Sequence, residues 1–368
     1  MRKTIAALLA LFLWGTSTGL AAVPPTSYPV VLVHGLGGYD NLLGNPYWGD
    51  DFGTFIGDPC DQFLETSCNA NIDSRQRTFV AQLIPLESSE VRGALLADEV
   101  ENYLATTGAR KVNLVGHSQG GLDIRKAAKV LYERNGRQMV QVMISISSPH
   151  RGSPIAKYIL DLGPGVTDVI NALFTFYGEI VYGPGNDGYA ATKQLVYNDY
   201  DPADGIATGA KLFNQNNPVS NLYAARYASL MTAQSGLSVN PALYLVRAGF
   251  YNIDGDGYCV DDCDNDGAGG KGDGNPNNDD DDGLVGINSQ QMGYRLRYTE
   301  CFLCQDSITT DLNLGYVGNL NAPSALQMTS KADVINQDHL DVIGMGPDTF
   351  DEKEFYAAIF AYIAQFGG

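Results

Sequence analysis

Residues 112–121 read VNLVGHSQGG, in which an apolar run is followed at once by a serine between small residues. Residues 112–116 predict a buried strand, and a helical pattern follows through Lys129. The pentapeptide Gly116-His117-Ser118-Gln119-Gly120 therefore stands between a strand and a helix, which is the context of a nucleophile elbow. Such a turn places the serine at a helix N-terminus, where backbone amides favour a developing negative charge. Ser118 is thus predicted to be a nucleophile.

Strands and helices alternate on both sides of this motif. Apolar runs predict buried strands at 29–34 and 139–146, and apolar residues at helical spacing predict a helix at 90–104. A later strand is expected at 241–248 and a closing helix at 352–366. Strands that alternate with helices in this way predict an α/β fold with a mostly parallel sheet and helices on both faces.

The positions of the four histidines leave one candidate for the general base. In hydrolases built on this elbow, the acid and then the base follow the serine along the chain. His34 precedes Ser118, His117 belongs to the elbow, and His150 follows the third strand too closely. His339 remains, and it is predicted to accept the proton of Ser118.

The acid must be chosen among many aspartates. Asp282 begins the segment DGLVG, in which a turn glycine and an apolar pair follow an acidic loop. A carboxylate at such a turn suits the task of orienting His339 and stabilising its cation. Asp282 is therefore the predicted acid, and Asp281, one residue earlier, is the alternative.

An oxyanion hole requires two backbone amides directed at the tetrahedral oxygen. One is expected from Gln119, which follows the nucleophile. The second is expected from Leu36, in the loop HGLGG at 34–38, whose glycines allow the backbone to approach a substrate closely. An ordinary glycine-rich connection after the first strand is the alternative.

The N-terminus has the pattern of an export signal. Arg2 and Lys3 precede an apolar run at 5–14, and small residues at 19–21 offer a cleavage site. Residues 1–21 are therefore predicted to be a signal peptide, and 22–368 a single catalytic domain that is secreted through the periplasm. The apolar run is too short to span a bilayer, so no transmembrane anchor is expected. The net charge of −19 makes a nucleic-acid partner unexpected.

The six cysteines form three close pairs, at 60 and 68, 259 and 263, and 301 and 304. In an exported chain such pairs predict local disulfides. A zinc site is the alternative for Cys301 and Cys304, which have ligand spacing, but no second ligand pair with a histidine lies nearby.

Residues 252–281 are predicted to be an Asp-rich calcium-binding insertion. Eleven aspartates and one basic residue, Lys271, lie between positions 254 and 282. Within this run, carboxylates alternate before a turn glycine, and a further aspartate falls at the twelfth position, as in an EF-hand loop. The expected ligands are Asp262, Asp264, Asp266 and Asp273. A solvated acidic loop is the alternative.

Together these segments resemble the secreted triacylglycerol lipases of the Pseudomonas and Burkholderia type. The resemblance is dense from 28 to 153 and returns at the acid and base motifs. The segments that carry it are YPVVLVHGLGGYDNLLG, SSEVRG, VNLVGHSQGG, SSPHRGS, GAKLFNQNNP, DGLVG and HLD. It implies an α/β-hydrolase fold with a helical lid, a triad of Ser118, Asp282 and His339, and oxyanion amides from Leu36 and Gln119.

The resemblance also implies a structural calcium ion near the base. Asp341, two residues after His339, is the expected ligand, with backbone oxygens of Met345 and Thr349 as companions. The family disulfide has no counterpart, because Ile287-Asn288-Ser289 stands where a cysteine is expected. A lipase-specific foldase is a further partner that the family resemblance suggests.

Residues 154–235 are predicted to form the lid or cap. Apolar residues recur at helical spacing between 166 and 181. This stripe predicts either a lid that opens at an oil surface or a cap that is packed permanently.

The expected function is hydrolysis of carboxylic esters of acyl glycerols at an oil–water interface, through an acyl-enzyme intermediate. The same triad would serve an esterase or a polyester depolymerase. A catalytically idle, calcium-dependent binding protein on the same fold is the alternative from another class. The presence of Ser118 together with His339 argues against it, because a binding protein has no need of them.

Overall fold

A computed structural model describes the chain at residues 22–38, 41–42, 45–46, 72–153, 155–156, 188–196, 200–201, 206–207, 209–234, 238–240, 243, 281–301, 304–344 and 350–368. Several sequence predictions lie outside these residues. They are the signal peptide at 1–21, the apolar stripe at 166–181, the cysteine pairs at 60 and 68 and at 259 and 263, the expected ligands Asp262, Asp264, Asp266 and Asp273, and the companions Met345 and Thr349.

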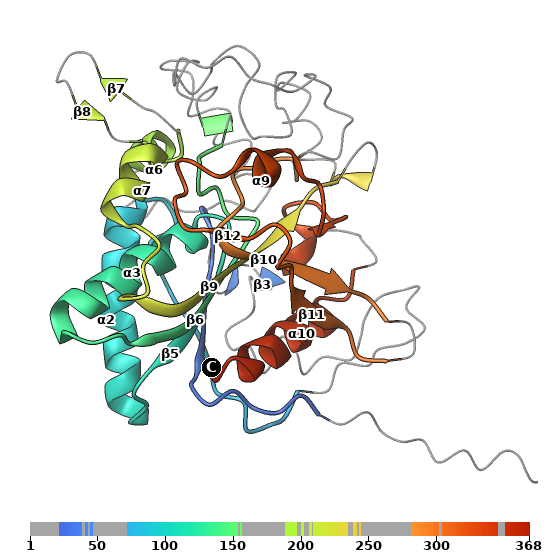
Figure 1. Ribbon diagram of the computed structural model, residues 1–368. Helices are drawn as coiled ribbons and strands as arrows, with labels where there is room; N and C mark the ends of the chain where they lie inside the picture. Colours follow the sequence, from blue (N-terminus) through green and yellow to red (C-terminus); the bar gives the residue numbers. More distant parts are fainter. Residues whose placement is uncertain are drawn as a thin grey trace, which may run out of the picture.

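The fold is organised around a mostly parallel sheet with the strand order β11-β10-β9-β6-β5-β1-β4 (Figure 1). From β4 to β10 every neighbouring pair is parallel, and β11 pairs antiparallel at the edge. The strands are β1 (Val30–Val33), β4 (Thr78–Val80), β5 (Val112–His117), β6 (Val140–Ile146), β9 (Ala224–Thr232), β10 (Gly293–Thr299) and β11 (Ser307–Thr310). Two short strands extend the sheet: β12 (Tyr316–Val317) beside β10, and β13 (Val334–Ile335) beside β9.

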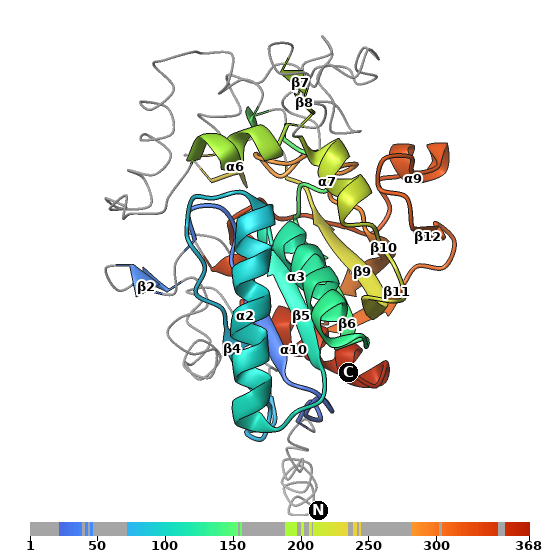
Figure 2. The same cartoon turned by 90° about the vertical axis from the view of Figure 1, so that its left-hand side faces the viewer.

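Helices cover both faces of this sheet. Figure 2 shows α2 (Ser89–Thr107) and α3 (Gly120–Asn135) on one face, and α10 (Glu352–Gln365) on the other. Alternate residues of β1 point to the two faces, so that Val30 and Leu32 pack with α10 while Val31 and Val33 pack with α2 and α3. Because both faces are buried, the strand is a continuous apolar run instead of an alternating one.

The remaining elements are short. They are the helices α6 (Gly188–Gln194), α7 (Ala210–Asn216) and α9 (Ala325–Thr329), the 3-10 turn η3 (Asp341–Ile343), and the two-residue strands β2 (Asn41–Leu42), β3 (Asn45–Pro46), β7 (Tyr200–Asp201) and β8 (Ile206–Ala207). In the described part of the chain, no helix has both the length and the apolar character that a membrane span requires.

The predicted strands and helices around the elbow are confirmed. The strands predicted at 29–34, 112–116 and 139–146 are β1, β5 and β6, and the helix at 352–366 is α10. The helix predicted at 90–104 is α2, which continues to Thr107 and ends where Gly108 takes the left-handed conformation.

One boundary of the predicted cap is wrong. The cap was expected to extend over 154–235, but β9 (Ala224–Thr232) lies inside the central sheet, between β6 and β10. The sequence AARYASLMT lacks a long apolar run, and strand formation there depends on partners on both sides. The strand predicted at 241–248 lies outside the described residues except for Leu243.

The long stretch between Asp282 and His339 forms β10, β11, β12, α9 and β13. Near its first hairpin, Cys301 and Cys304 form a disulfide. The local disulfide predicted for this pair is therefore confirmed, and zinc binding by two free thiolates does not apply to it.

Candidate active site

Ser118 lies at the tip of a strained turn between β5 and α3. Its backbone has φ 54°, a left-handed conformation that residues with a side chain rarely adopt. Its N–H donates to Ile146 O at 2.9 Å, which ties the turn to the neighbouring strand β6. Ser118 is partly exposed while His117 and Gln119 are buried. Strain of this kind at a partly exposed nucleophilic residue is typical of a catalytic position.

The glycines around Ser118 are required by close backbone contacts. A Cβ atom on Gly116 would lie 2.4 Å from Gly120 O, and one on Gly120 would lie 2.2 Å from Val33 O. A Cβ atom on Gly121 would lie 2.0 Å from Ser148 Oγ. The elbow therefore packs directly against β1 and against the loop after β6, and no side chain fits between them.

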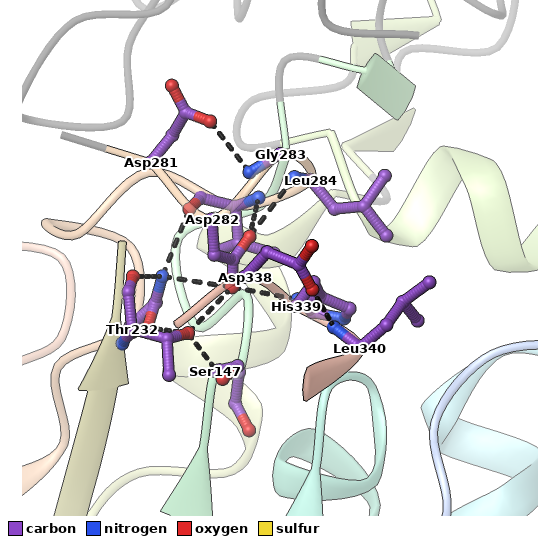
Figure 3. Close-up of polar contacts among 12 residues, drawn as sticks. Ser147, Thr232, Asp281, Asp282, Gly283, Leu284, Asp338, His339 and Leu340 are labelled. Carbon is purple, nitrogen blue, oxygen red and sulfur yellow. Dashed lines mark hydrogen bonds and ion pairs between the residues drawn. The ribbon is translucent and has the colours of Figure 1, made fainter. Parts of the chain in front are cut away.

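Asp282 and His339 form a buried hydrogen-bonded pair (Figure 3). His339 Nδ1 donates to Asp282 Oδ2 at 2.8 Å, and the backbone N–H of His339 donates to Asp282 O at 2.9 Å. Both side chains are almost fully buried. Because the Nδ1–H group donates the hydrogen bond to the carboxylate, Nε2 of a neutral His339 is the unprotonated ring nitrogen that can act as a base.

His117 brings this pair next to the elbow. Its Nε2 donates to His339 O at 2.9 Å, and the two imidazole rings lie 4.7 Å apart between centroids. Burial, and then the nearby His339, lower the pKa of His117 well below the ordinary value. His117 therefore stays neutral and, as the residue that precedes Ser118, connects the elbow to the loop of His339.

The alternative acid, Asp281, occupies a different place in the same turn. Its Oδ1 accepts from the N–H of Gly283 at 2.7 Å, and Figure 3 shows its carboxylate on the far side of the turn from His339. The described contacts thus bring Asp282, and not Asp281, to the imidazole of His339.

The predicted oxyanion loop is fixed by backbone and side-chain contacts. Gly37 N–H donates to Pro85 O at 2.8 Å, and Arg92 Nη2 donates to the carbonyl oxygens of His34 at 2.7 Å and Gly35 at 3.2 Å. Within the described residues, the backbone N–H of Leu36 has no hydrogen-bond acceptor, and neither has that of Gln119. Two such amides are what an oxyanion hole requires.

Arg92 is itself held by a buried ion pair that sequence analysis did not identify. Its Nε lies 2.8 Å from Asp123 Oδ2, and both side chains are fully buried. Burial raises the pKa of Asp123, and the Arg92 charge opposes that shift. The motif SSEVRG contributed to the family resemblance, but nothing in the sequence indicated that its arginine pairs with Asp123 on α3.

The other two histidines have structural contacts. His34 Nε2 accepts from the N–H of Leu83 at 3.2 Å, and burial, assisted by Arg92, lowers the pKa of His34 to about 3. His150 Nε2 bonds Ser145 Oγ at 2.9 Å, and burial lowers its pKa well below the ordinary value. Each ring is therefore neutral near pH 7.

Asp341 lies in the loop that carries His339. Its Oδ2 accepts from the N–H of Asp338 at 2.8 Å, while Asp338 Oδ2 accepts from the N–H of Asn240 at 2.6 Å. Buried carboxylates are suitable oxygen ligands for calcium. Among the described residues, however, no group of three or more His, Cys, Asp or Glu side chains is arranged to hold an ion. The calcium site that the resemblance implies also uses Met345 and Thr349, which lie outside the described residues, so it stays a prediction.

Sequence comparisons connect the chain to known lipases. The family described as palmitoyl protein thioesterase matches residues 29–203. A triacylglycerol lipase of Vibrio cholerae is 42% identical over 139 residues, which are 38% of this chain and 38% of that protein. A triacylglycerol lipase of Burkholderia plantarii is 33% identical over 200 residues, covering 49% of this chain and 50% of that protein. The predicted resemblance to triacylglycerol lipases is confirmed, although the chain spans 38–56% of the length of the curated relatives it matches.

Solved structures agree on the fold. EstA from Clostridium botulinum matches with a TM-score of 0.52 at 19% identity, over 94% of this chain and 89% of that one. Lipase 1 from Pelosinus fermentans also matches with a TM-score of 0.52 at 19% identity, over 92% of this chain and 99% of that one. With its mostly parallel sheet and its serine elbow after β5, the chain has the α/β-hydrolase fold, as predicted.

Proposed function

We propose that this chain is a secreted carboxylic-ester hydrolase that acts on acyl glycerols, with Ser118 as nucleophile, His339 as base and Asp282 as acid. The observation that carries the proposal is the buried hydrogen bond between Asp282 and His339, in a loop whose backbone contacts the elbow of Ser118. The similarity to triacylglycerol lipases supports the choice of substrate class.

In the proposed reaction, His339 Nε2 accepts the proton of Ser118 as its Oγ attacks the ester carbonyl carbon. The N–H groups of Leu36 and Gln119 donate to the oxygen that becomes negative. The imidazolium then protonates the departing alcohol, which leaves an acyl-enzyme. Water, deprotonated by the same imidazole, releases the fatty acid and restores the serine.

The triad is tested by Ser118→Ala, His339→Ala and Asp282→Asn, with Asp281→Asn as the matched control. The first two should each lower ester hydrolysis by ~10³-fold or more in a folded protein. Asp282→Asn should cause a severe loss because an amide cannot stabilise the imidazolium, whereas Asp281→Asn should stay within a few-fold of the original. Covalent labelling by a fluorophosphonate should modify Ser118 and fail in Ser118→Ala. Activity within tenfold of the original after Ser118→Ala or His339→Ala would contradict the assignment.

The substrate class is tested with three acyl donors. We expect emulsified triglyceride to be turned over faster than a soluble short-chain ester or an acyl thioester, the last being suggested by the family match to palmitoyl protein thioesterase. A preference for the soluble ester would make the chain an esterase. Activity on a polyester film, with none on the other substrates, would make it a polyester depolymerase. Rates that rise above the solubility limit of a short triglyceride would indicate a lid that opens at the interface.

Calcium is proposed as a structural ion and not as a participant in the reaction. Calcium that binds only the folded state would stabilise it by about 2.7 kcal/mol at a hundredfold excess over the dissociation constant. We expect chelation to lower both Tm and rate, Asp341→Asn to reproduce the loss of rate, and Asp264→Asn to lower Tm with little effect on rate. Equal melting and turnover of a metal-free preparation, verified by elemental analysis, would remove calcium from the proposal.

Export and folding are tested on the full chain. We propose that residues 1–21 direct secretion, so the N-terminus of protein recovered from the medium should begin near residue 22. Recovery of full activity after unassisted refolding from urea would show that no foldase is required.

A further inference from the structure

The side chain of Gln290 pairs with the end of β9 as a neighbouring strand would. Its Oε1 accepts from the backbone N–H of Thr232 at 2.8 Å, and its Nε2 donates to Thr232 O at 2.9 Å. The same Nε2 group reaches Asp282 Oδ2 at 3.2 Å and Val285 O at 3.0 Å. Gln290 is fully buried. One carboxamide thus connects the last residue of β9 with the turn that carries Asp282.

Thr232 makes a second connection to the same carboxylate oxygen. Its Oγ1 donates to Asp282 Oδ2 at 3.0 Å and lies 2.6 Å from Ser147 Oγ (Figure 3). A threonine hydroxyl has one proton, so a Thr232 that donates to Asp282 accepts from Ser147. Ser147 has φ 51° and is therefore strained, like Ser118.

The two oxygens of Asp282 are held in different ways. Oδ1 accepts from the backbone N–H groups of Leu284 at 3.0 Å and Val285 at 2.8 Å, both in its own turn. Oδ2, which accepts the hydrogen bond from His339 Nδ1, has its other donors on Thr232 and Gln290. The turn alone fixes one oxygen, and the side chains from outside it fix the plane of the carboxylate.

We infer that Thr232 and Gln290 are positioning residues, which tie the acid turn to the end of β9 and direct Asp282 Oδ2 at His339. This inference rests on the proposed function, because it assigns their role through the triad. Without these donors to Oδ2, the carboxylate should be free to rotate about its Cβ–Cγ bond. His339 would then lose its fixed orientation.

Kinetics of Gln290→Met and Thr232→Val test this inference. Both changes nearly conserve volume and remove the donors to Asp282. We expect kcat to fall by about 10- to 100-fold, the range for a misplaced catalytic group, with KM within twofold because neither residue is placed against the substrate. Thr232→Ser, which keeps the hydroxyl, should restore most of kcat. The double variant should lose less than the product of the single losses, because the two residues share one network.

Gln291→Met is the matched control. Gln291 is the adjacent residue, is also buried, and makes three hydrogen bonds, to Asn288, Gln327 and Arg295. None of these partners is Asp282. The control should therefore lose stability as Gln290→Met does while keeping kcat within twofold of the original.

A spectroscopic readout separates this inference from the proposed function. The proton between His339 Nδ1 and Asp282 should give a low-field NMR resonance that His339→Ala removes. That resonance should move or broaden in Gln290→Met and Thr232→Val and stay unchanged in Gln291→Met. Unchanged kcat and an unchanged resonance in the first two variants would overturn the inference. Full activity of His339→Ala would instead overturn the proposed triad, whatever Thr232 and Gln290 do. If Gln290→Met does not fold, the comparison of Thr232→Val with Thr232→Ser decides the question.

Discussion

The backbone of Ser118 combines strain with a close-packed surrounding. Its φ is 54°, and the glycines on either side let β1 and the loop after β6 approach the turn within contact distance. The strain is maintained because the surrounding backbone leaves no space for the turn to relax. A side chain at any of these glycines should therefore affect both stability and the position of Ser118.

Gly120→Ala tests this at the scale of one residue. The new Cβ would lie 2.2 Å from Val33 O, a backbone atom that cannot rotate away. We expect a loss of about 1–3 kcal/mol in the free energy of unfolding, together with a fall in kcat. Gly188→Ala is the control, because its Cβ would meet its nearest atom, Leu86 Cδ1, at 3.9 Å. Urea unfolding and ester kinetics measure both effects, and equal stability of the two variants would contradict the packing argument.

At the scale of elements, Arg92 joins α2, α3 and the predicted oxyanion loop. Its guanidinium pairs with Asp123 on α3 and donates to the backbone of His34 and Gly35. Because such a pair is costly to desolvate, it adds little net stability. Its main effect is to fix the relative positions of α2, α3 and the loop. The loop that carries Leu36 is thereby attached to the two helices that pack on one face of the sheet.

Asp123→Ala should be among the more destabilising changes in the chain. It would leave the Arg92 charge buried and uncompensated, at a cost of about 3–5 kcal/mol in the free energy of unfolding. Asp98→Ala is the control, because Asp98 pairs with Arg134 with its side chain 55% exposed. That pair should contribute about 1 kcal/mol or less. Chemical unfolding of the two variants compares them directly, and similar losses would show that burial of the Arg92 pair has no special effect.

At the scale of the whole molecule, burial keeps three of the four histidines uncharged. The pKa of His34 is lowered to about 3, and those of His117 and His150 are also lowered by burial. Each of these rings would be protonated more easily in the unfolded chain. The folded state should therefore lose stability as the solution becomes mildly acidic.

His34 shows in which direction pH changes the stability, and by how much. Between pH 6.5, where an unfolded histidine titrates, and about 3, the unfolded state binds a proton that the folded state does not. Lowering the pH through this window thus favours unfolding, by roughly 1.4 kcal/mol per pH unit for each such histidine. Urea unfolding at about pH 7, 6 and 5 measures how steeply the free energy of unfolding falls as the pH is lowered. His34→Gln should reduce this slope by the contribution of one histidine. An unchanged slope in that variant would contradict the assignment.

The sequence by itself determined the local parts of the fold and two members of the candidate triad. The strand, elbow and helix around Ser118 follow from apolar runs and glycines that act over a few neighbouring residues. His339 follows from the small number of histidines and their order along the chain. The buried strands β1, β5 and β6 are recognisable because both of their faces are apolar.

Tertiary structure decided what depends on distant partners. Asp281 and Asp282 are equivalent as neighbours in the sequence, and only the shape of their turn places one carboxylate against His339. β9 has no long apolar run of its own, and it is a strand because β6 and β10 supply its hydrogen bonds. The contacts of Gln290 with Thr232 join residues 58 positions apart, and a polar side chain shows no partner until the chain has folded around it.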